Sequence, residues 1–245
     1  MDVVLLRVGI DSGSGKTHGP LFPDGSFEFI PIPDEFGVSS KTYGKARARK
    51  KIKGKKCPLI RFFPDNLKWK MAWRPIHDDP EFETFTYGDR TTRKGSLRLN
   101  KGDLLVFYAG LQRQNERKPK PALYIIGYFE VEKAGLVGTF DKPTLRKYFS
   151  NNFHIRHRSK LLLRDKKERD LVLVRGGKGS RLLKKAILFA NPSPVRKGTY
   201  RLTKKMELIL GDLGHITRAW PRKVDEKHTA KAVDFLRRRR WDAVD

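Results

Sequence analysis

The chain has 245 residues, with 54 Lys and Arg against 27 Asp and Glu and a formal net charge of +27, so it can bury a sizeable core as one large domain or two small ones. Its apolar runs are far shorter than the roughly 18 residues of a membrane span, and its start is too quickly polar for a signal peptide, so we expect a cytoplasmic protein without a membrane partner. One cysteine, Cys57, excludes an internal disulfide framework and a multi-cysteine zinc site, and the low Cys and Met content with 33% charged residues is typical of thermophilic proteins.

The apolar pattern predicts several strands in the first half of the chain. Residues 3–10 form a buried strand, followed by a loop rich in Gly and Ser over 11–19, and residues 27–32 form a second extended segment next to prolines. Residues 104–109 and 123–131 are the strongest strands, and the polar loop between them predicts an antiparallel pair.

The second half predicts helices beside further strands. Asp141, with a proline two positions later, begins a helix, and Thr203 caps another through Leu210. We expect a strand over 171–174, a short helix over 180–185 that leads into a strand over 186–190, and a last helix over about 224–241. Strands and helices without strict alternation indicate an α+β fold, with a mixed sheet or partly closed barrel and flanking helices. We assign 1–192 to this α+β domain, with a basic insertion over 41–56, and 193–245 to a basic helical extension of it.

Positive charge is concentrated in a few segments, which indicates a polyanionic partner. Residues 45–56 hold eight basic residues and no acid, and 237–240 form a second basic block. The first run lacks apolar periodicity, so we predict a loop or arm that becomes ordered on DNA or RNA. The residues expected to contact phosphates there are Lys45, Arg47, Arg49, Lys50 and Lys51.

A glycine-rich segment, Gly13-Ser-Gly-Lys-Thr17, follows the first strand as a phosphate-binding P-loop would. The P-loop pattern needs a glycine where Ile10 stands, and the sequence after Thr17 contains Gly and Pro that prevent a helix. An NTPase is therefore disfavoured. Asp11, at the end of a strand beside flexible backbone, still indicates a loop that contacts a ligand.

The stretch from His77 to Asp89 combines an imidazole, five acids and a tyrosine. His77, Asp79 and Asp89 are candidates for general acid–base catalysis, together with Asp11. A metal bound by His77 and Asp79 is an alternative, but the spacing does not define a metal site and we predict none. An acidic surface loop paired with neighbouring Lys and Arg is a third interpretation.

Two further basic stretches are candidates for contact with phosphates or base edges. The first contains His154, Arg156 and Arg158, and the second contains Arg175, Lys178 and Arg181. The structural alternatives are a histidine held in the core and a plain turn between two elements.

Four segments together resemble the nucleotide modification associated domain 3 family. They are 7–15, 19–33, 79–89 and 102–111, and they run in the family's order over most of the first 190 residues. The resemblance implies a role beside systems that modify bases in nucleic acid. Residues 102–108 and 124–131 also resemble the core hairpin of PUA-like and EVE-type domains, which hold a base among aromatic side chains, so Tyr108, Tyr124 and Tyr128 are candidates for base stacking, and Tyr87 is a further candidate near the acids.

These patterns lead to one hypothesis and one alternative. The hypothesis is a nucleic-acid-binding protein associated with base modification, either an enzyme or a reader, in which the candidate acids converge on one cavity. The alternative is a non-enzymatic RNA-binding protein, for example one on the ribosome, in which acids are scattered and paired with Arg. The sequence identifies no cofactor and no oligomeric state.

Overall fold

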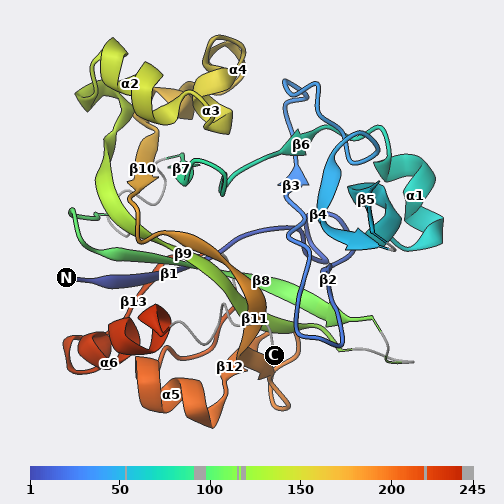
Figure 1. The fold of residues 1–245 in the computed structure, drawn as a ribbon, viewed down its shortest axis with the longest axis vertical. Helices are drawn as coiled ribbons and strands as arrows, with labels where there is room; N and C mark the ends of the chain where they lie inside the picture. The colour runs from blue at the N-terminus through green and yellow to red at the C-terminus, as the bar shows by residue number, and fades with distance from the viewer. Residues whose placement is uncertain (53, 91–97, 115, 117–119, 218–219, 239–245) are drawn as a thin grey trace.

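A computed structural model describes residues 1–52, 54–90, 98–114, 116, 120–217 and 220–238 (Figure 1). Its strands are β1 (Val3–Arg7), β2 (Gly19–Leu21), β3 (Ile32–Pro33), β4 (Arg47–Ile52), β5 (Lys55–Pro58), β6 (Ile76–His77), β7 (Thr86–Asp89), β8 (Leu104–Arg113), β9 (Ala122–Leu136), β10 (Val172–Gly176), β11 (Arg181–Pro192), β12 (Tyr200–Leu202) and β13 (Arg222–Lys223). Its α-helices are α1 (Asp65–Met71), α2 (Lys142–Phe149), α3 (Phe153–Arg156), α4 (Arg158–Arg164), α5 (Lys204–Leu210) and α6 (Glu226–Arg237), and its 3-10 helices include η1 (Leu59–Phe62), η3 (Val137–Thr139) and η4 (Lys166–Asp170). The predicted α+β class is confirmed.

Nine strands of the described chain form one mixed sheet. β8 and β9 are its antiparallel centre, as predicted, while β1 and β2 pair in parallel with β8. The main order is β12-β11-β9-β8-β1-β13, with β10 against both β9 and β7. β12 and β13, at the two ends of this order, do not pair with each other in the described part of the chain. The sheet therefore stays open, and the barrel alternative is wrong.

The two faces of β8 pack against different partners because side chains alternate along a strand. Val106 and Tyr108 face the layer made by α5 and α6, which lies on one side of the sheet in Figure 1. Leu105 and Phe107 face the other way, into a core that also contains Phe82. The unbroken apolar run of β8 thus reflects burial on both faces.

The C-terminal segment is part of the same core. Phe235 and Leu236 of α6 are buried in one cluster with Val3 and Leu5 of β1, and β13 pairs with β1. Thr203 accepts a hydrogen bond from a backbone N–H at the start of α5, as the sequence predicts. Residues 239–241 of the predicted last helix lie outside the described residues. None of the described helices is long and apolar enough to cross a membrane.

The basic insertion is a β-hairpin with a core of its own, which corrects the prediction of a loop without core contacts. β4 and β5 pair in antiparallel, and Ala46 and Ala48 are buried with Tyr43 and Phe63. The cations at the alternate positions point outward, so buried alanines and exposed cations alternate along this strand. Of the eight basic residues in this run, Lys53 lies outside the described residues.

The predicted helix over residues 180–185 is wrong, because this segment is the first half of β11. Arg181 and Leu182 pair with Tyr128 and Gly127 of β9. Partner strands supply this segment's backbone hydrogen bonds, and tertiary pairing overrides its weak local preference for a helix.

Candidate functional site

A cavity of about 270 Å³ lies where β1, β6, β7 and α3 come together. Its wall is built from five separate stretches of the chain, residues 7–14, Ile32, residues 77–79, residues 87–90 and His154. The polar residues in this wall are Arg7, Asp11, Ser14, His77, Asp79, Tyr87, Asp89, Arg90 and His154. We refer to it as the acidic cavity.

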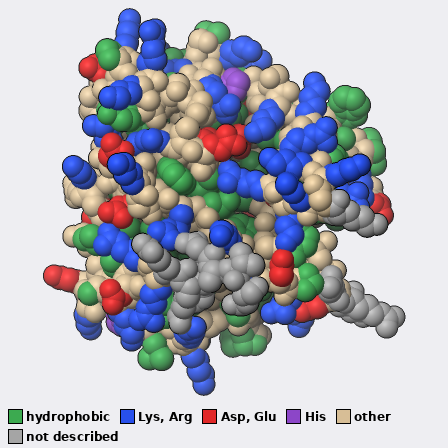
Figure 2. Space-filling view, viewed as in Figure 1, with side chains coloured by type: hydrophobic (Ala, Val, Ile, Leu, Met, Phe, Trp, Pro, Cys, Tyr) green, Lys and Arg blue, Asp and Glu red, His purple; other side chains and the backbone are tan. Residues whose placement is uncertain are grey.

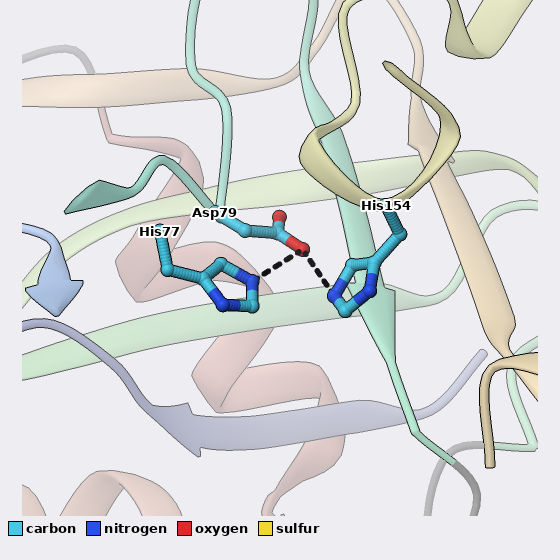
Figure 3. A group of neighbouring side chains, drawn as sticks. All are labelled: His77, Asp79 and His154. Carbon is cyan, nitrogen blue, oxygen red and sulfur yellow. Dashed lines mark ion pairs between the residues drawn. The ribbon is translucent and has the colours of Figure 1, made fainter. Parts of the chain in front are cut away.

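Two imidazoles and one carboxylate lie together in the wall of the acidic cavity (Figure 3). The Oδ2 atom of Asp79 lies 3.6 Å from Nε2 of His154 and 4.0 Å from Nε2 of His77. One nitrogen or oxygen of each of the three residues lies within 4.8 Å of those of the other two. Figure 3 shows the Asp79 carboxylate between the two rings, an arrangement that could hold a metal ion.

A backbone hydrogen bond holds the Asp79 carboxylate in place, and burial disfavours its charged form. Its Oδ2 accepts a hydrogen bond of 2.8 Å from the backbone N–H of Gly88 in β7, and its side chain is only 2% exposed. Burial raises the pKa of this carboxyl well above its ordinary value, and the nearby charges of Asp89 and Asp78 act in the same direction. Its other oxygen, Oδ1, is buried and makes no hydrogen bond of regular geometry among the described residues, although the side chain of Asn152 lies beside the carboxyl and lowers its pKa.

His154 is oriented from behind by Glu168 of η4. Its Nδ1 lies 3.0 Å from Oε2 of Glu168, whose side chain is fully buried. Asn152 precedes α3 and accepts a hydrogen bond from the backbone N–H of His154, so the helix begins at a position that directs this ring inward. The Nδ1–carboxylate contact leaves Nε2 of His154 facing the acidic cavity.

His77 is held by stacking rather than by a carboxylate. Its ring lies on that of Phe153, with centroids 3.9 Å apart and planes 18° apart. Burial lowers the pKa of His77 well below its ordinary 6.5, and the neighbouring His154 and Arg90 lower it further. His77 is therefore neutral at physiological pH, as a ligand or a general base would need to be.

The outer wall carries the cations of the acidic cavity. Arg7 Nη2 lies 3.3 Å from Asp11 Oδ2, and Asp11 Oδ1 accepts hydrogen bonds from the backbone N–H groups of Gly13 and Ser14. Burial alone would raise the pKa of Asp11, but the bonds from Ser14 and the charge of Arg7 lower it, so Asp11 stays ionised. Asp11 thus organises its loop as well as lining the cavity.

On the opposite side, Asp89 and Arg90 close the wall. The hydroxyl of Tyr87 donates to Asp89 Oδ2 over 3.0 Å. Arg90 forms an ion pair of 2.6 Å with Asp165 and reaches to 4.0 Å from Glu168. These contacts tie β7 to η4.

The structure brings together all four residues that the sequence proposes for catalysis, Asp11, His77, Asp79 and Asp89, with Tyr87 beside them. Their chemical roles stay predictions. The sequence reasoning missed Arg7, Arg90 and Glu168 as supports of this site. Arg90 follows directly on the predicted Asp89, whereas nothing near Glu168 in the sequence marks its contact.

Two sequence predictions do not fit the structure. Tyr108 cannot stack on a base in the acidic cavity, because it is 0% exposed, lies on the opposite face of β8 and packs against Phe189. His154 is predicted to contact phosphate with its basic neighbours, but it is buried between Glu168 and Asp79 and so belongs to the cavity floor. The first error arises because successive side chains of a strand point to opposite faces of the sheet. The second arises because the ring nitrogens of His154 face two buried carboxylates.

The remaining basic candidates lie in separate places. Arg47, Arg49 and Arg156 line a second cavity, of about 220 Å³, between the β4–β5 hairpin and residues 78–83. Lys45 and Lys51 are exposed on the hairpin, whereas Lys50 forms a 2.7 Å ion pair with Asp24.

The other basic candidates of these two stretches are in part used for contacts within the protein. Arg158 donates to the backbone carbonyl of Glu168, Arg175 lies 4.0 Å from the Glu132 carboxylate and Arg181 lies over the ring of Tyr128. Lys178 is exposed in the turn between β10 and β11. Figure 2 shows Lys and Arg spread over one whole face, densely over β4, β5 and α1, with acidic side chains between that region and the helices α2–α4.

A model of the family described as nucleotide modification associated domain 3 matches residues 2–234. The chain belongs to the nucleotide modification associated domain 3 family. The match covers β1 through most of α6, and this extent agrees with the single core that joins β1 to α6. No curated protein and no solved structure matches the chain. The likeness of the β8–β9 hairpin to PUA-like domains stays a prediction.

Proposed function

We propose that this protein is an enzyme that modifies a base in nucleic acid, with the base in the acidic cavity and the phosphate backbone on the basic surface around it. The observation that carries this proposal is the convergence of Asp11, His77, Asp79 and Asp89 on one cavity. A protein that only binds polyanions gains nothing from carboxylates gathered beside its phosphate contacts, because they repel phosphate. The name of the family supports a link to nucleotide modification.

The size of the cavity favours one base over a larger ligand. Its volume of about 270 Å³ lies just below the range of about 300–1,000 Å³ that is typical of pockets for drug-sized ligands. Chemistry on a base requires that the base leave the stack, either in a single strand or by flipping out of a duplex. Arg7 and Arg90 at the wall are placed to attract the phosphate of such a nucleotide.

Two exposed tryptophans favour an unstacked strand as the substrate. Trp69 on α1 and Trp73 just after it are 75% and 78% exposed. Their segment packs against the basic insertion, since Gly44 N–H donates to the Ala72 carbonyl and Met71 shares a core with Ala46 and Ala48. Aromatic rings among cations are typical of surfaces that bind single strands, where a stacked base contributes about 1–3 kcal/mol.

The alternative, a non-enzymatic RNA-binding protein such as one on the ribosome, predicts acids that are each paired with Lys or Arg. Asp24–Lys50 and Asp78–Lys41 are such pairs. Asp79 is different, because its ion-pair neighbours in the described part of the chain are the two histidines. This difference favours the enzyme.

The test is mass spectrometry of nucleosides after incubating single-stranded and duplex DNA and RNA with the purified protein, and from cells with and without the gene. A modified nucleoside that depends on the protein supports the proposal, and Asp89→Asn should remove it. Asp234→Asn, on the exposed face of α6, is the matched control and should keep it. Tight binding with unchanged nucleosides in every sample, from cells and in vitro, would favour the RNA-binding alternative.

A further inference from the structure

We infer that His77, Asp79 and His154 bind one divalent transition-metal ion at the floor of the acidic cavity. The inference deepens the proposed function by naming an ion that the same site would hold, but metal binding can be measured whether or not a base is modified. It stands on the geometry of three side chains, a buried carboxylate oxygen without a regular hydrogen bond and the contact that orients His154.

The distances between the three side chains are close to those of a metal site. Bonds of about 2.0–2.2 Å to imidazole nitrogen and carboxylate oxygen place neighbouring donor atoms about 3.3–3.6 Å apart in a tetrahedral site. The observed separations from Asp79 Oδ2 are 3.6 Å to His154 and 4.0 Å to His77, and the donor atoms of all three residues lie within 4.8 Å of one another. Small rotations of the His77 and His154 side chains toward Asp79 and toward each other would bring all three atoms around one ion.

The orientation of His154 requires a cation or a proton in front of its ring. Its Nδ1 is 3.0 Å from Glu168 and is placed to donate to that carboxylate, so Nε2 of a neutral ring presents a lone pair. That lone pair faces Asp79 Oδ2, another acceptor. A proton between them would draw the two atoms to about 2.7–3.2 Å, the usual hydrogen-bond distance, whereas they lie 3.6 Å apart. The wider gap fits a metal ion better than a shared proton.

Asp79 supplies the second, independent indication. Its Oδ1 is buried and makes no hydrogen bond of regular geometry among the described residues, although the side chain of Asn152 lies beside this carboxyl, and a buried oxygen without such a bond is unfavourable. A cation beside this carboxylate would offset the penalty. Gly88 N–H holds the other oxygen, so the carboxylate cannot turn away from the two rings without losing that bond.

The donor set defines the class of metal. Two imidazoles with one carboxylate suit Fe(II), Zn(II) and similar ions, whereas Mg²⁺ and Ca²⁺ prefer sites made of oxygen ligands. Three protein ligands leave coordination positions open toward the cavity, as in catalytic rather than structural zinc sites. Glu168 is a positioning residue, since a carboxylate behind a metal-bound histidine fixes its ring and raises its basicity.

The experiment uses the full chain, freed of metal by a chelator and titrated with Co(II) while its visible absorption is recorded, and with Zn(II) by calorimetry. We expect one ion per chain, displacement of Co(II) by Zn(II), and no displacement by Mg²⁺. His154→Ala and Asp79→Asn should abolish the signal. Glu168→Gln should keep the stoichiometry, weaken binding about 10–100-fold and shift the cobalt absorption bands.

A surface pair on α6 gives the matched control. His228 Nδ1 lies 2.6 Å from Asp225, so His228→Ala removes a histidine next to a carboxylate without touching the acidic cavity. This variant should bind metal as the wild type does. If a buried variant fails to fold, His77→Ala tests the same point, because the His77 side chain is 17% exposed to the cavity and less embedded. Unchanged binding in folded His77→Ala, or no binding by the wild type, would overturn the inference, whereas metal binding without base modification would count against the proposed function alone.

Discussion

Gly88→Ala is the substitution that tests the packing of the acidic cavity most directly. A Cβ at this position would lie 2.7 Å from Cδ2 of His154, 3.3 Å from Oδ1 of Asn152 and 3.4 Å from Oδ2 of Asp79. Carbon atoms in contact are normally about 3.5–4.0 Å apart, so the ring of His154 must move by about 1 Å. The ring has little room to do so, because Glu168 holds it from behind.

The expected cost is that of overpacking, about 1–3 kcal/mol of the free energy of unfolding. For a chain of this size the melting temperature falls by about 2–4 °C per kcal/mol, which gives a decrease of roughly 2–12 °C. Thermal unfolding followed by circular dichroism measures this decrease, and the metal titration measures the displacement of His154. Gly138→Ala is the control, because nothing lies within 4 Å of a Cβ there. A Gly88→Ala protein that melts and binds metal like the Gly138→Ala control would refute the described packing.

Two further predictions concern the basic hairpin. The first replaces by serine three exposed cations of the insertion, Lys45, Arg47 and Lys51. Each lost phosphate contact removes about 0.9 from the slope of log affinity against log salt, so the slope should become less steep by about 3. The melting temperature should stay unchanged. In contrast, Ala48→Asp places a charge in the buried row of the hairpin and should lower the melting temperature. The second concerns acid: hydrogen bonds from Lys50 and then from Ser26 lower the pKa of Asp24 from 3.8 to about 2, so the stabilisation from these contacts is present above the ordinary pKa and is lost as pH falls toward about 2. Because the Asp24 side chain is 57% exposed, Asp24→Asn should lower the free energy of unfolding by at most about 1 kcal/mol at neutral pH and leave it unchanged near pH 2. Thermal melts recorded over a range of acid pH measure this, and a difference between variant and wild type that does not depend on pH would contradict the pairing.

The sequence predicts the elements whose signals are local. The apolar runs of β8 and β9 and the caps at Asp141 and Thr203 identify strands and helices directly, because alternation and capping act within a few residues. The convergence of Asp11, Asp79 and Asp89 is predicted for a different reason. Neighbouring carboxylates repel one another and destabilise the fold, so a cluster of them indicates a functional site.

What the sequence does not predict depends on tertiary partners. The hairpin was hidden because its buried residues are alanines, which give a weak apolar signal between lysines and arginines. Glu168 lies 14 positions from the histidine that it orients, in a segment that otherwise resembles a charged surface turn. Tyr108 was misassigned because a residue's face in a doubly buried strand cannot be decided from an all-apolar run.

The strands that pair with β1 are synthesised long after β1 itself. β1 lies between β8 and β13, so the first strand made is flanked by partners that leave the ribosome about a hundred and about two hundred residues later. Until residues 104–108 emerge, β1 lacks its parallel partner strand, and its other edge stays uncovered until residues 222 and 223 follow. The acidic cavity, which β1 helps to line, is therefore completed only when most of the chain has been made.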